Sequence, residues 1–215
     1  MSLCYEQSKC LNCKSDLKIL RKSSNIVTVY SATGSKEYIH LLKVCSHQAC
    51  RSHYHFTHFT KKNVFYKEKN LAKFFYEDST RKNIFLSSNY TGFESSYLRS
   101  MMTDMMLCPE YSFCQKATAY NLSVPTGNLE LNQKRLLEGF MLFALLEMLT
   151  MYIPNSKLSS TAFSFDLDEN LNTWTTALKD GFQGHHATHR CNTPGCGSVI
   201  GWDADCKVFL NDFLS

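Results

Sequence analysis

The sequence predicts an α+β protein in which a β-rich N-terminal region packs on a helical core. Two regions of different periodicity predict this class. Residues 1–90 alternate β-branched and aromatic residues with polar ones, whereas residues 91–155 space apolar residues at the 3.6-residue period of a helix. A third observation is that ten cysteines occur in 215 residues and that several form closely spaced pairs. We expect three regions, 1–90, 91–155 and 156–215.

Strands are predicted where short β-branched or aromatic segments are bounded by turn residues. Residues 32–35 (Ala-Thr-Gly-Ser) supply the turn of a first hairpin. The alternating segment 51–66 predicts a strand pair that turns at residues 61–63. The predicted strands are 25–31, 39–45, the pair within 51–66, 74–76 and 84–86.

Helices are predicted from residue 91 onward. Thr91 and Glu94 have the spacing of a capping box, in which the hydroxyl and the carboxylate satisfy backbone amides of the first turn. Pro109 suits the first turn of a second helix. The longest predicted helix is apolar on nearly all sides, so it forms the centre of the core. The predicted helices are 91–107, 109–120, 131–152 and 168–179.

Composition places the chain among globular proteins. Hydrophobic residues make up 44% and charged residues 20%, which excludes a disordered tail or a simple coiled coil. The longest apolar stretch, 136–153, falls short of the roughly 20 residues of a bilayer span and contains Glu138 and Glu147, so we expect no contact with a membrane. Because the chain opens without a secretion signal, we expect metal binding rather than disulfides to explain the cysteines.

The N-terminal cysteines form a C-x2-C pair, Cys10 and Cys13, and a C-x4-C pair, Cys45 and Cys50. Two such pairs separated by a hairpin can place four thiolates tetrahedrally around Zn²⁺. We therefore predict a zinc-ribbon-like site, with His47 as an alternative to Cys50.

A second zinc site is predicted near the C-terminus. Cys191 and Cys196 form another C-x4-C pair, with Pro194 and Gly195 to turn the chain. His189 and Cys206 can complete a Cys3His tetrahedron, and His185 and His186 are alternative donors. We expect this small zinc knuckle to follow the helix at 168–179.

Other candidate site residues carry weaker signals. In an extended strand His53 and His55 share a face and His58 points to the other, so we expect a hydrated or core-edge set rather than a metal site. The sequence contains no H-E-x-x-H, G-x-x-x-x-G-K or G-x-S-x-G motif. We assign no catalytic residue and expect no enzymatic activity.

Charge is divided unevenly along the chain. Residues 1–100 hold 16 Lys and Arg against 7 Asp and Glu, a balance of +9, whereas residues 101–215 hold 7 against 12, a balance of −5. Aromatic residues at 65–66 and 74–76 lie among the basic ones, and exposed rings could stack on bases while cations bind phosphates. The predicted nucleic-acid-binding residues are Lys61, Lys62, Lys67, Lys69, Lys73, Arg81 and Lys82.

The order of these elements resembles the cysteine-cluster domains found beside KDZ (Kyakuja-Dileera-Zisupton) transposases. The resemblance rests on the opening C-x2-C, the hairpin, the second cysteine pair before an aromatic strand, the long apolar helix and the final H-x-C-x4-C. Residues 203–207 keep the Asp and Lys of that family's D-G-x-x-K segment but replace its Gly. The resemblance implies a recognition region whose catalytic domain lies elsewhere.

We therefore expect a zinc-stabilised DNA-recognition module of a transposase-like or transposase-derived protein, located in the nucleus. The alternative is a chromatin module in which an aromatic cage binds a modified lysine of a histone tail or another protein, because a cation held against ring faces requires the same residue types.

Overall fold

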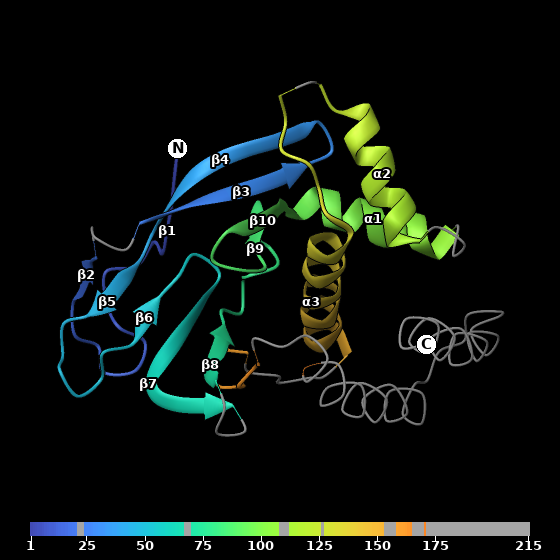
Figure 1. Cartoon of the computed structure of the whole chain (residues 1–215). Helices are drawn as coiled ribbons and strands as arrows, with labels where there is room; N and C mark the ends of the chain where they lie inside the picture. Colours follow the sequence, from blue (N-terminus) through green and yellow to red (C-terminus); the bar gives the residue numbers. More distant parts are fainter. Residues whose placement is uncertain are drawn as a thin grey trace, which may run out of the picture. The chain divides into compact units, whose positions relative to one another are not determined.

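A computed structural model describes residues 1–20, 24–66, 70–107, 112–125, 127–152, 158–164 and 170. The chain divides into two compact units, Met1–Lys179 and Asp180–Ser215, and the second unit lies outside the described residues. The described part of the first unit contains two five-stranded sheets and three helices (Figure 1). The predicted mixed α+β class is thus confirmed.

The first sheet has the strand order β1-β4-β3-β10-β9. β3 and β4 form an antiparallel hairpin, and both β1 and β10 join it in parallel. The hairpin turn is shorter than the predicted one, because β4 already begins at Gly34. Its strands are β1 (Ser2–Cys4), β3 (Asn25–Ser31), β4 (Gly34–Leu41), β9 (Ile84–Leu86) and β10 (Thr91–Glu94).

The second sheet has the order β2-β5-β6-β7-β8, and all its neighbours are antiparallel. The predicted turn at 61–63 is wrong, since these residues lie within β7 and the chain reverses at 55–57. The amide of His55 donates to the carbonyl of His58 across this tighter turn. The strands are β2 (Leu17–Ile19), β5 (Lys43–Cys45), β6 (His53–Tyr54), β7 (His58–Tyr66) and β8 (Asn70–Phe75).

The turn between β6 and β7 connects the two sheets. The hydroxyl of Thr57 donates to the carbonyl of Leu86 on β9, and Phe56 packs against the cluster that contains Val27 and Val29 of β3. This contact places the end of β6 against the first sheet.

The helices are α1 (Ser95–Leu107), α2 (Phe113–Ser123) and α3 (Gln133–Tyr152). The predicted capping box at Thr91 is wrong, because Thr91–Glu94 forms β10. Tertiary packing decides this: Phe93 is fully buried, and Gly139 of α3 lies so close that an added Cβ would be 2.2 Å from its ring. The capping box in the described part belongs instead to Ser112 and Gln115, at the start of α2.

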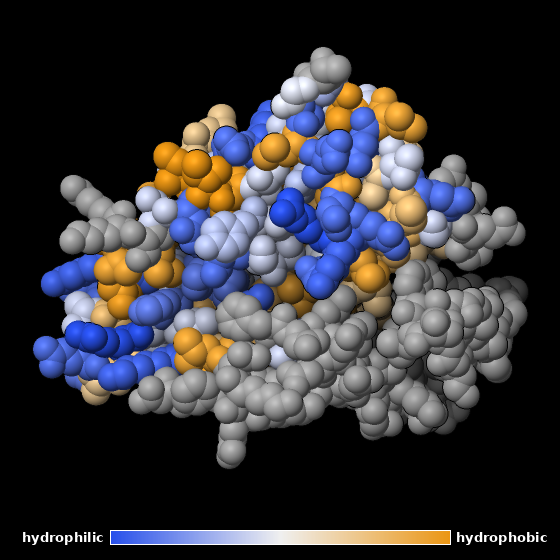
Figure 2. Space-filling model, in the orientation of Figure 1, coloured by the Kyte–Doolittle hydropathy of each residue, from blue (hydrophilic) through white to orange (hydrophobic). Residues whose placement is uncertain are grey.

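Among the described residues, no helix is long and apolar enough to cross a membrane. On the face shown in Figure 2, the hydrophobic atoms form several small groups with hydrophilic ones between them. Ile26 and Ile39, which are opposite each other on β3 and β4, are exposed.

Candidate metal centre

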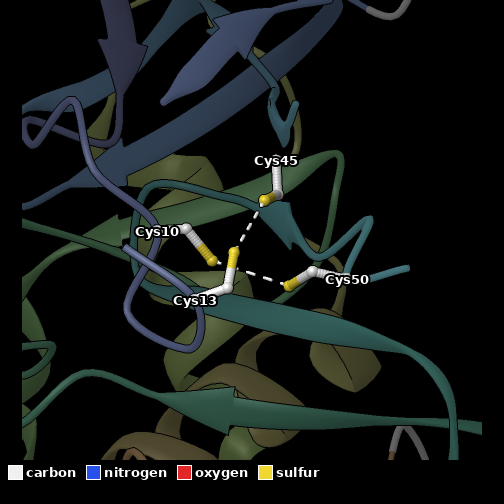
Figure 3. Close-up of side chains that lie close together, drawn as sticks. All are labelled: Cys10, Cys13, Cys45 and Cys50. Atoms are coloured by element: carbon white, nitrogen blue, oxygen red, sulfur yellow. Dashed lines mark hydrogen bonds between the residues drawn. The ribbon is translucent and has the colours of Figure 1, made fainter. Parts of the chain in front are cut away.

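Four thiols converge at one end of the second sheet (Figure 3). The ligand atoms of Cys10, Cys13, Cys45 and Cys50, here called the cysteine cluster, all lie within 4.8 Å of one another. The Sγ atoms of Cys13 and Cys45 are 3.3 Å apart and those of Cys10 and Cys50 are 3.6 Å apart, both longer than the 2.05 Å of a disulfide. The group could hold a metal ion.

The first cysteine pair lies on a tight turn between β1 and β2. The amide of Lys14 donates to the carbonyl of Cys10 at 3.0 Å, and Lys14 itself has a left-handed φ of 62°. An ion pair between Lys9 and Asp16, at 2.8 Å, closes the base of the turn. The reversal after Cys13 directs both thiols to the same side.

The second pair repeats this arrangement between β5 and β6. The carbonyl of His47 accepts hydrogen bonds from the amides of Cys50 and Arg51, at 3.1 and 3.0 Å. Arg51, like Lys14, follows the second cysteine of its pair and has a positive φ, here 37°. His47 is exposed and does not belong to the cysteine cluster, so the alternative that placed it as a ligand is not supported.

Hydrogen bonds hold the two turns together without involving the thiols. The amide of Ser46 donates to the carbonyl of Asp16 at 3.0 Å, and the side-chain amide of Asn12 donates to the hydroxyl of Ser52 at 3.0 Å. The convergence of four cysteines from segments 32 residues apart is therefore built into the backbone.

Two neighbouring hydroxyls contact the cluster, and sequence patterns did not identify them. The hydroxyl of Tyr54 lies 3.2 Å from Sγ of Cys10 and accepts the amide of Leu11 at 2.9 Å. The hydroxyl of Ser52 lies 3.2 Å from Sγ of Cys50. Such outer-shell groups orient metal ligands and tune their basicity. The sequence feature that could have identified Tyr54 is its position four residues after Cys50, on the strand that follows the second cysteine pair.

The thiols differ in their protonation. Hydrogen bonds from the side chain and backbone of Ser15 lower the pKa of Cys13 to about 6, whereas burial raises the pKa of Cys45 to about 12. A divalent cation among the four sulfur atoms would favour the thiolate form of all of them.

The three predicted strand histidines have different positions from those expected. Because the chain turns at 55–57, the rings of His55 and His58 stack, with centroids 4.4 Å apart. The ring of His40 on β4 packs against that of His55 at a tilt of 32°, with centroids 5.3 Å apart. We call His40, His55 and His58 the histidine column. His53 lies outside it and is half-buried. Sequence reasoning did not consider His40, which no local pattern connects to the other two.

The predicted nucleic-acid-binding residues do not form one surface. Lys62 and Arg81 are exposed, and Nζ of Lys61 lies 4.3 Å from the ring centroid of Phe74. In contrast, Lys73 is 4% exposed and donates to the carbonyl of Ser87. Lys67 and Lys69 lie outside the described residues.

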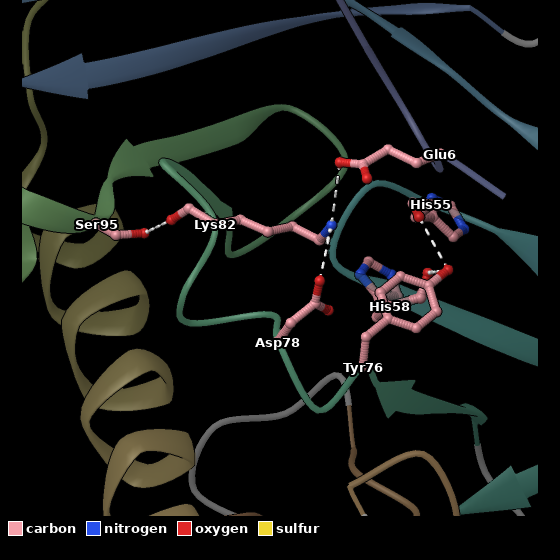
Figure 4. A network of polar contacts seen from close by, with 7 residues as sticks. All are labelled: Glu6, His55, His58, Tyr76, Asp78, Lys82 and Ser95. Atoms are coloured by element: carbon pink, nitrogen blue, oxygen red, sulfur yellow. Dashed lines mark hydrogen bonds and ion pairs between the residues drawn. The ribbon is translucent and has the colours of Figure 1, made fainter.

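Lys82 is also held in internal contacts rather than presented to solvent. Its Nζ is 3.6 Å from Glu6 and 3.3 Å from Asp78, and its side chain is only 10% exposed (Figure 4). The aromatic residues Phe74, Phe75 and Tyr76 are buried as well. The expectation that these three rings are available for stacking is wrong, because the neighbours Phe74 and Phe75, which alternate between the two faces of the strand, are both buried, as is Tyr76.

The predicted second zinc site falls in the second unit. Its residues His189, Cys191, Cys196 and Cys206, and the alternative donors His185 and His186, lie outside the described residues. A second zinc site at these residues therefore remains a prediction.

The resemblance to the cysteine-cluster domains beside KDZ transposases also stays a prediction. Comparison of the chain with protein-family models, with curated proteins and with solved structures finds no match.

Proposed function

We propose that the chain is a zinc-stabilised module that recognises nucleic acid, with DNA as the favoured partner, and that it does so without catalysis. The observation that carries the zinc part is the convergence of four thiols on two matched turns. Four cysteine sulfur ligands favour Zn²⁺ over the hard cations, which prefer oxygen ligands. The ion would be structural, because four protein ligands leave no open position for a substrate.

Metal analysis tests the zinc assignment. Protein purified without chelator should contain zinc, one equivalent for the cysteine cluster and a second for His189, Cys191, Cys196 and Cys206. Cobalt substitution should give the intense visible absorption of a tetrahedral thiolate site. Iron in place of zinc, or less than one equivalent of any metal, would contradict the assignment.

The support for nucleic-acid binding is the charge of +9 over residues 1–100. A tetrathiolate zinc centre would itself carry a formal charge of 2−. Of the predicted nucleic-acid-binding residues, those that remain for phosphate are Lys61, Lys62 and Arg81, together with Lys67 and Lys69, which lie outside the described residues. Buried Lys73 and ion-paired Lys82 are left out of the proposed surface.

A pair of matched charge reversals tests this surface. Lys62→Glu with Arg81→Glu changes two exposed residues and should weaken binding to duplex DNA, with a smaller dependence of affinity on salt, because fewer counterions are released. Lys134→Glu with Arg135→Glu makes the same change of charge at the start of α3 and should have less effect. Equal affinity of both variants and the unaltered chain would contradict the proposal.

The role in a transposase-like or transposase-derived protein, and the nuclear location, belong to the same proposal and rest on the order of the sequence elements. The alternative, an aromatic cage for a modified lysine, receives no support from Phe74, Phe75 and Tyr76, which are buried. A binding panel that includes histone-tail peptides beside DNA and RNA separates the two functions.

A further inference from the structure

The histidine column lies where the two sheets meet. His40 belongs to β4 of the first sheet, whereas His55 and His58 flank the turn between β6 and β7 of the second. His40 is 2% exposed and His58 is 1% exposed. The rings of His55 and His58 are nearly parallel, with an angle of 8° between their planes. Three imidazoles thus form part of the contact between the sheets.

The second sheet holds its two histidines firmly. The hydroxyl of Tyr76 lies 3.0 Å from the carbonyl of His55 and 2.9 Å from that of His58, as Figure 4 shows. The amide of His55 donates to the carbonyl of His58 at 2.8 Å. These bonds fix the backbone of the turn that carries both rings.

The imidazoles have few polar partners. Nε2 of His40, Nδ1 of His55 and Nε2 of His58 are buried and have no hydrogen-bond partner among the described residues. The group of described residues that could hold a metal ion contains none of the three histidines. The column is therefore not arranged as a metal site.

The surrounding charges oppose protonation. Lys73 of β8 and His53 of β6 are the other charged or titratable groups that act on the rings, and both are basic. Glu138 of α3 acts on Lys73. The nearby carboxylates Glu6 and Asp78 are engaged by Lys82 instead (Figure 4). An imidazolium in the column would have no close counter-ion among the described residues.

We propose that the histidine column is an acid-sensitive contact between the two sheets, closed while its three imidazoles are neutral and opened when they take up protons. Burial lowers the pKa of His55 to about 3, lowers that of His40, and holds that of His58 well below 6.5. In the separated state the same groups titrate near 6.5. The open state therefore binds more protons as the pH falls, and the contact loses stability below about pH 6.5.

The size of the effect follows from the number of protons. Between pH 7 and pH 5.5, each imidazole that titrates at 6.5 only in the open state raises the unfolding constant about eightfold. His55 and His58 together raise it about seventyfold, and His40, whose pKa burial also lowers, adds to this effect.

Chemical denaturation of the zinc-loaded chain tests the proposal. His55→Gln with His58→Gln keeps polar side chains of similar size but removes two titrating groups. Between pH 7 and pH 5.5 the unfolding constant should increase in both proteins, and the fold-increase should be about seventy times larger for the unaltered chain than for this variant. Protonation of the cysteine ligands affects both proteins equally, so the difference isolates the histidines.

Equal pH dependence of the double variant and the unaltered chain would overturn the proposal. A second measurement needs no variant and serves if the double variant does not fold. The nitrogen chemical shifts of the imidazoles report their protonation state. In the folded chain, these shifts should show His40, His55 and His58 as neutral at every pH above the acid transition. Titration of any of them near pH 6.5 in the folded protein would also overturn the proposal.

Discussion

The cysteine cluster and the histidine column are both groups of side chains of types that can bind metals, but among the described residues only the cysteine cluster is a group that could hold a metal ion. In the cluster, four sulfur atoms lie within 4.8 Å of one another. In the column, the rings of His55 and His58 stack, and the ring of His40 packs at a tilt against that of His55. The difference arises in the backbone: each cysteine pair spans a tight turn followed by a left-handed residue, whereas the histidines come from strands and a turn that are fixed by other contacts.

This comparison shows that ligand identity and proximity do not by themselves define a metal site. Donor atoms must converge on one point, and the rest of their lone pairs or protons must be satisfied around it. The cysteine cluster has the hydroxyls of Tyr54 and Ser52 beside its sulfur atoms, while the column leaves three ring nitrogens without partners among the described residues.

Removal of a cluster ligand should have the largest effect. Cys45→Ser replaces a buried cysteine of the cluster, and a structural zinc ion there would contribute about 10 to 16 kcal/mol, comparable with the total stability of a domain. We expect this variant to lose the metal and the folded structure of the second sheet, as measured by metal content and circular dichroism. Cys114→Ser, at an exposed cysteine of α2, is the control and should retain both. Retention of the metal by Cys45→Ser would show that three ligands suffice.

The second-largest effect is expected from removal of the Tyr76 hydroxyl, which holds the turn of the histidine column. Tyr76→Phe leaves the carbonyls of His55 and His58 without their shared donor, and a buried unsatisfied group costs about 1 to 3 kcal/mol. Urea denaturation at pH 7 should show this loss, with no change in metal affinity. Tyr90→Phe, at an exposed position, should be neutral. A fall in metal affinity with Tyr76→Phe would mean that the two groups are energetically coupled.

Loss of the outer-shell hydroxyl at the cysteine cluster should weaken the metal site without abolishing it. Tyr54→Phe removes the group that contacts Sγ of Cys10 and accepts the amide of Leu11. Outer-shell changes of this kind reduce metal affinity about 10- to 100-fold, which a competition titration with a chromophoric chelator measures. Unchanged affinity would show that the hydroxyl only fills space beside the cluster.

Replacement of Lys14, the left-handed residue of the first cysteine turn, should have the smallest effect on stability, and it should stabilise the protein where the other changes destabilise it. Lys14 has a φ of 62°, which costs a non-glycine residue roughly 1 to 2 kcal/mol. Lys14→Gly removes this strain but adds freedom to the unfolded chain, for a net gain of about 0.5 to 1 kcal/mol in thermal unfolding. Lys18→Gly in β2 is the control and should be destabilising by a similar amount. Destabilisation by Lys14→Gly would indicate that the side chain itself supports the site.

The N-terminal ligands could be predicted from the sequence because cysteine spacing is a local property. A C-x2-C or C-x4-C pair needs only one turn to direct both thiols to the same side, and the pairs at Cys10 and Cys45 follow that rule. The strand at 25–31 and the helix at 131–152 were predictable for a similar reason, since β-branched residues and a continuous apolar face act over neighbouring positions.

Tertiary structure decided the features that depend on distant partners. Thr91–Glu94 has the sequence of a helix cap, yet it forms β10 because it pairs with β3 and because Phe93 packs against Gly139. The exposure of the predicted nucleic-acid-binding residues also depends on tertiary structure, since Lys73 is buried whereas Lys62 is exposed. Their charge was readable from the sequence, but their exposure depends on which face of a sheet another segment covers.

The sequence by itself determined that the chain folds as a mixture of strands and helices and that four N-terminal cysteines come together. Only the tertiary structure brought His40 beside His55 and His58, and placed Tyr54 against Cys10. The physical reason is range: turn geometry and periodicity act within a few residues, whereas the stacking of side chains from separate sheets exists only after the whole chain has folded.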